Sequence, residues 1–211
     1  MTTARLALIL LISSSFTAIA RAETPEADYD REITLALEAG PPSVTAKAGV
    51  FVHDKTGYVK VRDSENGFVC VVDHRVPTAV EPQCLDAEGV KAFLPKFQLV
   101  AALRAKGTAE PEIRKAVQAA FKAGTFKAPA RPGVIYMMSP HNVVTVDEEH
   151  GIAAPFPPHL MFYAPNLKSS DLGSDGAPTS PLFVVDEQTP HALMIVPVAT
   201  GHMAGHTHGG S

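Results

Sequence analysis

The chain has 211 residues, with 18 lysines and arginines against 22 acidic residues and a net charge of -4. A chain of this length can bury a hydrophobic core of its own. Its mildly acidic character offers no attraction for nucleic acid or anionic lipid, so we exclude nucleic acid and expect a small molecule or a metal ion as the partner.

The amino terminus has the three parts of a secretory signal peptide. A positive charge at Arg5 is followed by the apolar run 6–12 and by small residues that end in an Ala-x-Ala site at Ala22. This order predicts cleavage of residues 1–22 and export to the periplasm or the extracellular space. The apolar run is too short to cross a bilayer, which takes about 20 residues, so we expect no membrane insertion.

The residues after the signal predict one helix and then three strands. Pro25 suits the first turn of a helix over 24–39, and the apolar side chains of this segment form one stripe. Between residues 48 and 75, short alternating segments are separated by turns, the clearest at Asn66 and Gly67. We predict a three-stranded antiparallel meander.

The chain has two cysteines, Cys70 in the third predicted strand and Cys84 beyond it. In an oxidising compartment such a pair predicts a disulfide. The bond would close a loop of about 15 residues and stabilise the fold by about 3 kcal/mol. A reactive thiol and two free buried thiols are the alternatives.

The rest of the chain changes from helical to proline-rich. Residues 86–124 carry three amphipathic helical segments, and residues 129–197 hold 11 of the 18 prolines. Proline cannot donate a ladder hydrogen bond, so the apolar runs between these prolines predict edge strands, or strands that prolines begin and end. The runs are 134–138, 143–146, 160–163, 182–185 and 192–198.

These patterns together predict the α+β class. We expect a single domain over residues 23–200, in which about three to four amphipathic helices pack on an antiparallel sheet. The sheet combines the N-terminal meander with the C-terminal strands. Residues 201–211, rich in histidine and glycine, are expected to form a flexible tail.

Seven of the nine histidines lie after residue 140, which suggests a metal site. His141, His150 and His159 are each nine residues apart, with Glu148 and Glu149 among them. Imidazole and carboxylate are zinc ligands, but this spacing matches no tight metal motif. The three histidines can bind one ion only if the fold brings them together. The alternative is an exposed turn flanked by structural histidines.

A second group of histidines, His202, His206 and His208, lies in the glycine-rich tail. Such side chains can hold a metal ion, but loosely, because no packed shell orients them. A polar tail without a bound metal is the alternative.

Each of the five methionines after residue 22 lies within four residues of a histidine. Thioether and imidazole together suit copper, so copper and zinc are the candidate cofactors. Residues two apart on a strand share a face, so His159, Met161 and Tyr163 would point one way, with Leu160 and Phe162 facing the core. Met161 therefore joins the candidate ligands.

Met137, followed after 21 residues by a His-x-Met sequence at 159–161, resembles the arrangement found in periplasmic copper chaperones. The resemblance implies a copper site at these side chains and covers 25 residues. The chain departs from the family at Phe126, where the family has a further histidine or methionine. It departs again in the helical region 86–124, which that compact all-β family lacks.

The stretch 153–165 places prolines on both sides of an aromatic segment. Prolines fix the backbone at low entropic cost, so the stretch can preorganise a pocket wall formed by Phe156, His159, Met161 and Tyr163. It can equally end an edge strand without inviting aggregation.

Three functions fit these observations. The first is an exported binding domain with a pocket around residues 137–163 for a small ligand or a transition metal. The second is a metal-assisted, hydrolase-like enzyme in which His141, His150 and His159 hold the ion and a glutamate at 148 or 149 is the general base. The third is a structural or envelope interaction protein with incidental histidines.

Overall fold

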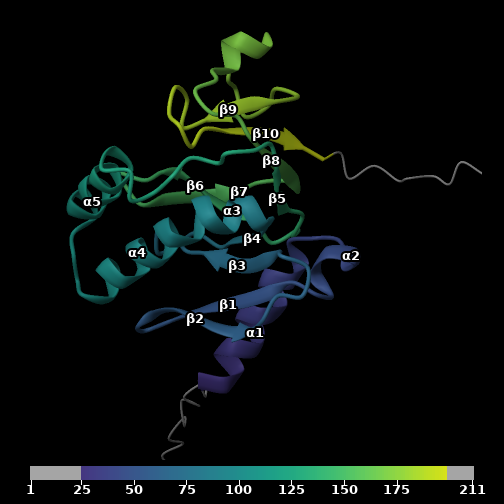
Figure 1. Ribbon diagram of the computed structural model, residues 1–211, viewed down its shortest axis with the longest axis vertical. Coiled ribbons are helices and arrows are strands. Elements are labelled where there is room, and N and C mark those ends of the chain that lie inside the picture. Colours follow the sequence, from purple (N-terminus) through teal and green to yellow (C-terminus); the bar gives the residue numbers. More distant parts are fainter. Residues whose placement is uncertain (1–24, 199–211) are drawn as a thin grey trace, which may run out of the picture.

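The computed structural model describes residues 25–198, which form one α+β domain, as predicted (Figure 1). An eight-stranded sheet has the strand order β2-β1-β3-β4-β5-β8-β10-β9. Its strands are β1 (Gly49–Asp54), β2 (Gly57–Arg62), β3 (Val69–Asp73), β4 (Glu81–Leu85), β5 (Val134–Met137), β8 (His159–Tyr163), β9 (Phe183–Val185) and β10 (Leu193–Pro197). A separate hairpin consists of β6 (Val143–Asp147) and β7 (Ile152–Pro155).

The sheet is mixed, so the prediction of an N-terminal antiparallel meander is wrong. β1 and β2 form the expected antiparallel hairpin, but β3 pairs with β1 in parallel and not with β2. The residues of β3 are all buried, whereas the charged side chains of Lys60 and Arg62 lie on β2. The apolar strand therefore occupies the centre of the sheet and the charged strand remains at its edge.

Five helices are present in the described chain, one more than the largest predicted number. α1 (Pro25–Glu38), α3 (Ala87–Ala92), α4 (Leu94–Ala105) and α5 (Glu110–Lys122) agree with predicted segments. The additional helix, α2 (Pro42–Thr45), is a single turn that begins at a proline. Four residues are too few to display a helical period, which explains why the sequence pattern missed it. Two strands, β4 and β7, were also missed.

The helices cover opposite faces of the sheet. Ala36 and Ala39 at the end of α1 pack with Cys70, Val72 and Cys84 on one face. On the other face, Phe93 and Phe97 of the α3–α4 region pack with Val69, Val71 and Leu85. Alternate residues of β3 therefore enter two different clusters, as the period of a strand requires. Within the described chain no helix is long and apolar enough to cross a membrane.

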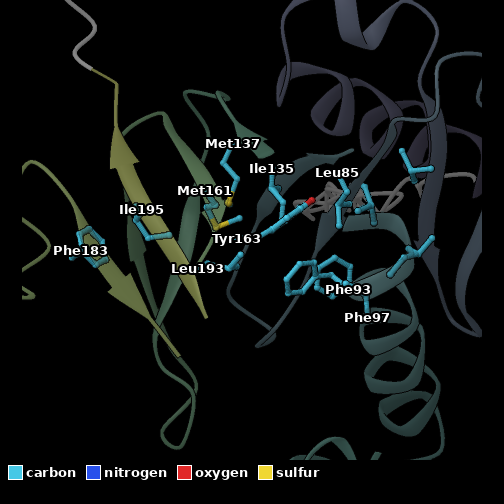
Figure 2. Close-up of a cluster of buried hydrophobic side chains, with 14 residues drawn as sticks. Leu85, Phe93, Phe97, Ile135, Met137, Met161, Tyr163, Phe183, Leu193 and Ile195 are labelled. Carbon is cyan, nitrogen blue, oxygen red and sulfur yellow. The ribbon is translucent and has the colours of Figure 1, made fainter. Parts of the chain in front are cut away.

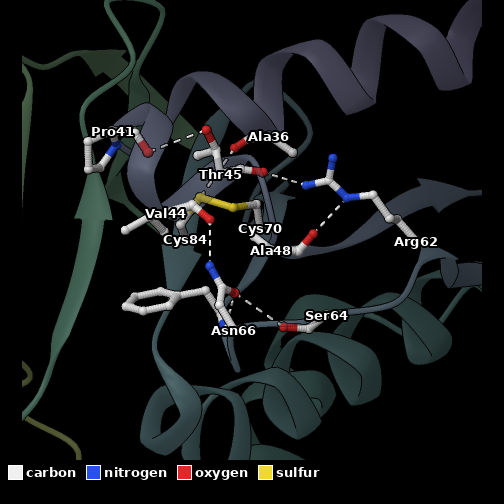
Figure 3. The surroundings of a disulfide bond; sticks show 11 residues. Ala36, Pro41, Val44, Thr45, Ala48, Arg62, Ser64, Asn66, Cys70 and Cys84 are labelled. Atoms are coloured by element: carbon white, nitrogen blue, oxygen red, sulfur yellow. Dashed lines mark hydrogen bonds between the residues drawn. A yellow bond between two sulfur atoms is a disulfide. The ribbon is translucent and has the colours of Figure 1, made fainter.

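The predicted disulfide between Cys70 and Cys84 is confirmed (Figure 3). The two cysteines are directly opposite each other on β3 and β4, and both side chains are fully buried. The bond lies under α1, where a Cβ added at Gly40 would meet the sulfur of Cys84 at 3.3 Å. The predicted signal peptide, residues 1–22, and the predicted tail, 201–211, lie outside the described residues.

A histidine–glutamate pair fastens α1 to the loop between β3 and β4. His74 Nε2 lies 3.0 Å from Glu32 Oε1, and His74 Nδ1 lies 2.9 Å from the carbonyl oxygen of Ala79. Burial lowers the pKa of the His74 imidazole, but the hydrogen bond and charge of Glu32 outweigh burial and raise the pKa above its ordinary value.

Because this pKa is raised by folding, the ion pair stabilises the protein fully below about pH 6.5 and loses its effect as the pH rises through the folded-state pKa. We expect His74→Gln to lose about 1 kcal/mol of the free energy of unfolding at acidic pH and less at pH 8.5 or so. Urea unfolding at both pH values measures this difference. Glu32→Gln should show the same dependence, and a loss that is equal at both pH values would contradict the explanation.

Candidate functional site

One face of the sheet forms the floor of a cavity of about 310 Å³. The register pairs Ile135 with Met161, Met161 with Ile195, and Ile195 with Phe183. Residues paired across a ladder share a face, so these side chains from β5, β8, β10 and β9 all point to the same side. Figure 2 shows them in a row from Phe183 to Ile135, with Phe93 and Phe97 near Leu85. The floor of this part of the cavity is apolar.

The roof consists mainly of the α3–α4 region and the β6–β7 hairpin, and the loop before β9 adds Pro178. The hairpin is attached to the sheet by Glu81, whose Oε1 accepts hydrogen bonds from the backbone N–H of Thr145 at 2.8 Å and from its hydroxyl at 2.7 Å. A bridge between Val80 and Val143 adds a backbone connection. The roof residues that line the cavity are Phe93, Lys96, Phe97, Val144, Thr145, Val146, Phe156 and Pro178.

Polar side chains gather at the end of the cavity nearest β3 and β4. Asp73 and Glu81 are opposite each other in the ladder and nearly buried, and Arg75 and Lys96 lie beside them. Burial raises the pKa of the Glu81 carboxyl, although the Arg75 guanidinium opposes this effect. Burial, with Arg75 nearby, lowers the pKa of the Lys96 ammonium. The cavity thus has an apolar part and a charged end.

His159 contributes a neutral polar group to the cavity. Its side chain is 2% exposed, and its Nδ1 lies 2.8 Å from the carbonyl oxygen of Pro157. Burial lowers the pKa of the imidazole, so the neutral form prevails at pH 7. Since only an N–H can donate to a carbonyl, the proton is assigned to Nδ1, and Nε2 is left as an acceptor.

The three histidines predicted to hold one metal ion, His141, His150 and His159, lie apart in the described chain, whereas Met161 lines the cavity with His159. His141 is exposed beside α1, with Nδ1 2.8 Å from Glu38 Oε2. His150 is exposed on the hairpin turn and contacts Asp147 at 2.7 Å. Among residues 25–198, no three His, Cys, Asp or Glu side chains are placed to hold a metal ion. The predicted tail ligands His202, His206 and His208 lie outside the described residues.

Three of the four residues predicted to form a pocket wall do line the cavity, and the fourth lies elsewhere. Phe156, His159 and Met161 line the cavity. Tyr163 lies in the adjoining core, where its hydroxyl donates to Asp86 at 2.6 Å.

The orientation of β8 is the reverse of the expected one. His159, Met161 and Tyr163 are the buried residues of this strand, and Leu160 and Phe162 on its other face are half-buried. The physical reason is the placement of the helices, because α1 packs mainly against β1, β3 and β4, whereas Met161 and Tyr163 join the cluster of Phe93 in the α3–α4 region.

No known protein family, characterised protein or solved structure matches this chain. Its function is therefore inferred from the cavity.

The charged end of the cavity was missed from the sequence. Asp73 ends one strand and Glu81 begins the next. Acids at such positions are also common beside solvent-exposed turns, so the sequence pattern does not indicate a buried site. Arg75 and Lys96 come from a loop and from α4. The only indication of the charged end in the sequence was the acidic residue next to the apolar residues of each of these two strands.

Proposed function

We propose that the protein is an exported binding protein that holds a small, largely apolar molecule in the cavity between the sheet, the α3–α4 region and the β6–β7 hairpin. The observation that carries this proposal is the cavity of about 310 Å³ with apolar walls and a few polar groups at one end, which is typical of ligand pockets. The signal-like residues 1–22 and the disulfide between Cys70 and Cys84 support export, because disulfides persist in oxidising compartments.

The apolar walls of the cavity favour a bound ligand, because an apolar molecule placed against them removes apolar surface from water. These walls also offer water few hydrogen bonds. A ligand that fills the space would therefore stabilise the fold. Compared with a volume of about 30 Å³ per water molecule, the space accepts about ten non-hydrogen atoms.

The alternatives have less support. A metal-assisted enzyme built on His141, His150 and His159 needs three ligands at one point, whereas two of these side chains are exposed and paired with different acids. A structural protein would need no cavity of this kind, and it would bind through an exposed apolar patch. We therefore favour binding of a small molecule.

Filling the cavity tests the proposal. We expect 1-octanol, a neutral molecule of suitable size, to bind the protein and to raise its melting temperature, because a ligand of the folded state stabilises it by mass action. Ile195→Phe places a larger side chain in the cavity and should weaken binding by about tenfold or more. Calorimetric titration with 1-octanol measures both affinities.

Met194→Phe is the matched control, because Met194 is the neighbouring residue on β10 and faces away from the cavity. Its affinity for 1-octanol should stay within about twofold of the unmodified protein. The proposal is wrong if the unmodified protein does not bind 1-octanol, or if the two substitutions weaken binding equally.

A further inference from the structure

A second, smaller cavity of about 150 Å³ adjoins the charged end of the first. The two cavities share five lining residues, which are Asp73, Arg75, Lys96, Phe97 and Asp186. The smaller one extends between α4 and α5 and reaches the 186–191 turn. The two cavities are therefore neighbours that meet at these side chains.

The smaller cavity has an excess of hydrogen-bond donors. Arg114 Nη1 and His191 Nδ1 are buried nitrogens without a hydrogen-bond partner among residues 25–198, and both side chains line this cavity. A buried polar group left unsatisfied destabilises a fold. Arg114 Nη1 can only donate, and the imidazole of His191, which burial keeps neutral, can carry its proton on Nδ1. A ligand that brings acceptor oxygens can therefore satisfy both nitrogens.

Arg75 and Lys96 also face the same space. Arg75 has its nearest carboxylate, that of Asp186, only at 3.9 Å, which is too long for a hydrogen bond. Burial and the Arg75 guanidinium both disfavour the charged form of Lys96, so these two cations repel each other in a partly dry site. An anion between them would relieve the repulsion and form charge-assisted hydrogen bonds.

Carboxylates also face the smaller cavity. Asp73, Glu148 and Asp186 also line it, and they balance the positive charges of Arg75, Lys96 and Arg114. The Asp186 carboxylate lies 3.9 Å from His191 Nε2, as far as it lies from Arg75. The preference for an anion therefore comes from the buried, unpaired N–H of Arg114 and not from the net charge.

The ring of His191 is held in place for such a contact. It stacks on Phe121 of α5, with the ring centroids 4.1 Å apart and the planes 15° from parallel. Stacking fixes the ring at the wall of the smaller cavity, so that its orphaned Nδ1 is preorganised and loses little entropy when a ligand binds.

We propose, on the basis of the binding function proposed above, that the ligand is an amphiphilic anion. Its apolar body occupies the larger cavity, and its acid group, a carboxylate or a phosphate, accepts hydrogen bonds from Arg114, His191, Arg75 and Lys96 in the smaller one. The chemical class is a medium-length alkyl or aryl acid.

A matched pair of probes tests the assignment. Octanoate and 1-octanol share the apolar chain and differ in the charged end. We expect the unmodified protein to bind octanoate about tenfold more tightly than 1-octanol at neutral pH. A difference in affinity of this size corresponds to the contribution of one hydrogen bond to a charged group. Octyl phosphate in a parallel titration distinguishes a phosphate from a carboxylate as the preferred acid group. Isothermal titration calorimetry measures the three dissociation constants.

Two substitutions locate the acid group. Arg114→Gln removes a donor that lines the smaller cavity alone, and Gln118→Glu adds a negative charge to the same wall. Each should reduce the preference for octanoate over 1-octanol from about tenfold to about one. Arg131→Gln is the control, since Arg131 lies on the surface with its side chain 71% exposed, and it should keep the preference. Gln118→Glu keeps the test decisive if Arg114→Gln does not fold.

The outcomes separate the two proposals. Equal affinity for octanoate and 1-octanol, or an unchanged preference in a folded variant of Arg114 or Gln118, would overturn the anion assignment and leave the binding function standing. If neither octanoate nor 1-octanol binds, both proposals are wrong.

Discussion

Replacing Asp86 with alanine is expected to lower the free energy of unfolding by about 4 kcal/mol. Asp86 caps α3, and its Oδ1 accepts hydrogen bonds from the backbone N–H groups of Glu88 and Gly89 at 3.0 and 2.9 Å. The same oxygen accepts from the Tyr163 hydroxyl, and Oδ2 accepts from the Val134 N–H at 2.9 Å. One carboxylate thus connects α3, β5 and β8, which carry the roof and the floor of the larger cavity.

The backbone around this junction leaves no free space. A Cβ added at Gly133 would lie 2.2 Å from Asp86 Oδ2 and 2.4 Å from Tyr163 Cε2, and one added at Gly89 would lie 2.3 Å from the Tyr163 hydroxyl. Close approach of this kind requires glycine. Gly133→Ala should therefore disrupt the same contacts, and its effect should not add to that of Asp86→Ala, because the two residues share partners.

Urea unfolding followed by circular dichroism measures the effect of Asp86→Ala. The comparison variant is Asp171→Ala, which removes one exposed hydrogen bond, to the Lys168 N–H at 3.0 Å, and should cost under about 1 kcal/mol. A loss of similar size in the two variants would contradict the central role of Asp86.

The second large effect concerns the disulfide. We expect the double variant Cys70→Ala with Cys84→Ala to lose about 3 kcal/mol of stability, because the unfolded chain regains the entropy of a loop of about 15 residues. For a domain of this size that loss lowers the melting temperature by about 6–12 °C. The bond also lies in the core under α1, so Ala36 and Ala39 should lose packing contacts.

Thermal unfolding with and without a thiol reductant provides the control for the double variant. The reductant should lower the melting temperature of the unmodified protein toward that of the variant and should leave the variant unchanged. If the reductant destabilises both proteins equally, it acts through something other than the bond between Cys70 and Cys84, and the expected contribution is wrong.

The helices and the disulfide were predictable because their signals are local. A proline in the first turn and an apolar stripe indicated α1, and a similar pattern with acids in the first turn indicated α5. The spacing of Cys70 and Cys84, with an expected oxidising compartment, indicated their bond. Each of these inferences used residues that are close together in the sequence, within one helix or within one short loop.

The histidine pattern was a weaker guide, because sequence spacing does not determine distance. His141 and His150 are exposed and contact acids on α1 and on the hairpin, whereas His159 lies buried in the cavity. The chain between them forms the β6–β7 hairpin, which is not part of the main sheet, and this separates the three histidines. Methionine and histidine two residues apart on β8 do share a face, and both line the cavity, as strand geometry requires.

By itself, then, the sequence determined the α+β class, four of the five described helices and the cysteine pair, all of which depend on neighbouring residues. Only the tertiary structure decided that β3 lies beside β1, that the His159 face of β8 is the buried one, and that Arg75, Lys96, Arg114 and His191 surround one small cavity. These features depend on contacts between segments that are far apart in the chain, and such contacts are set by which faces the helices cover.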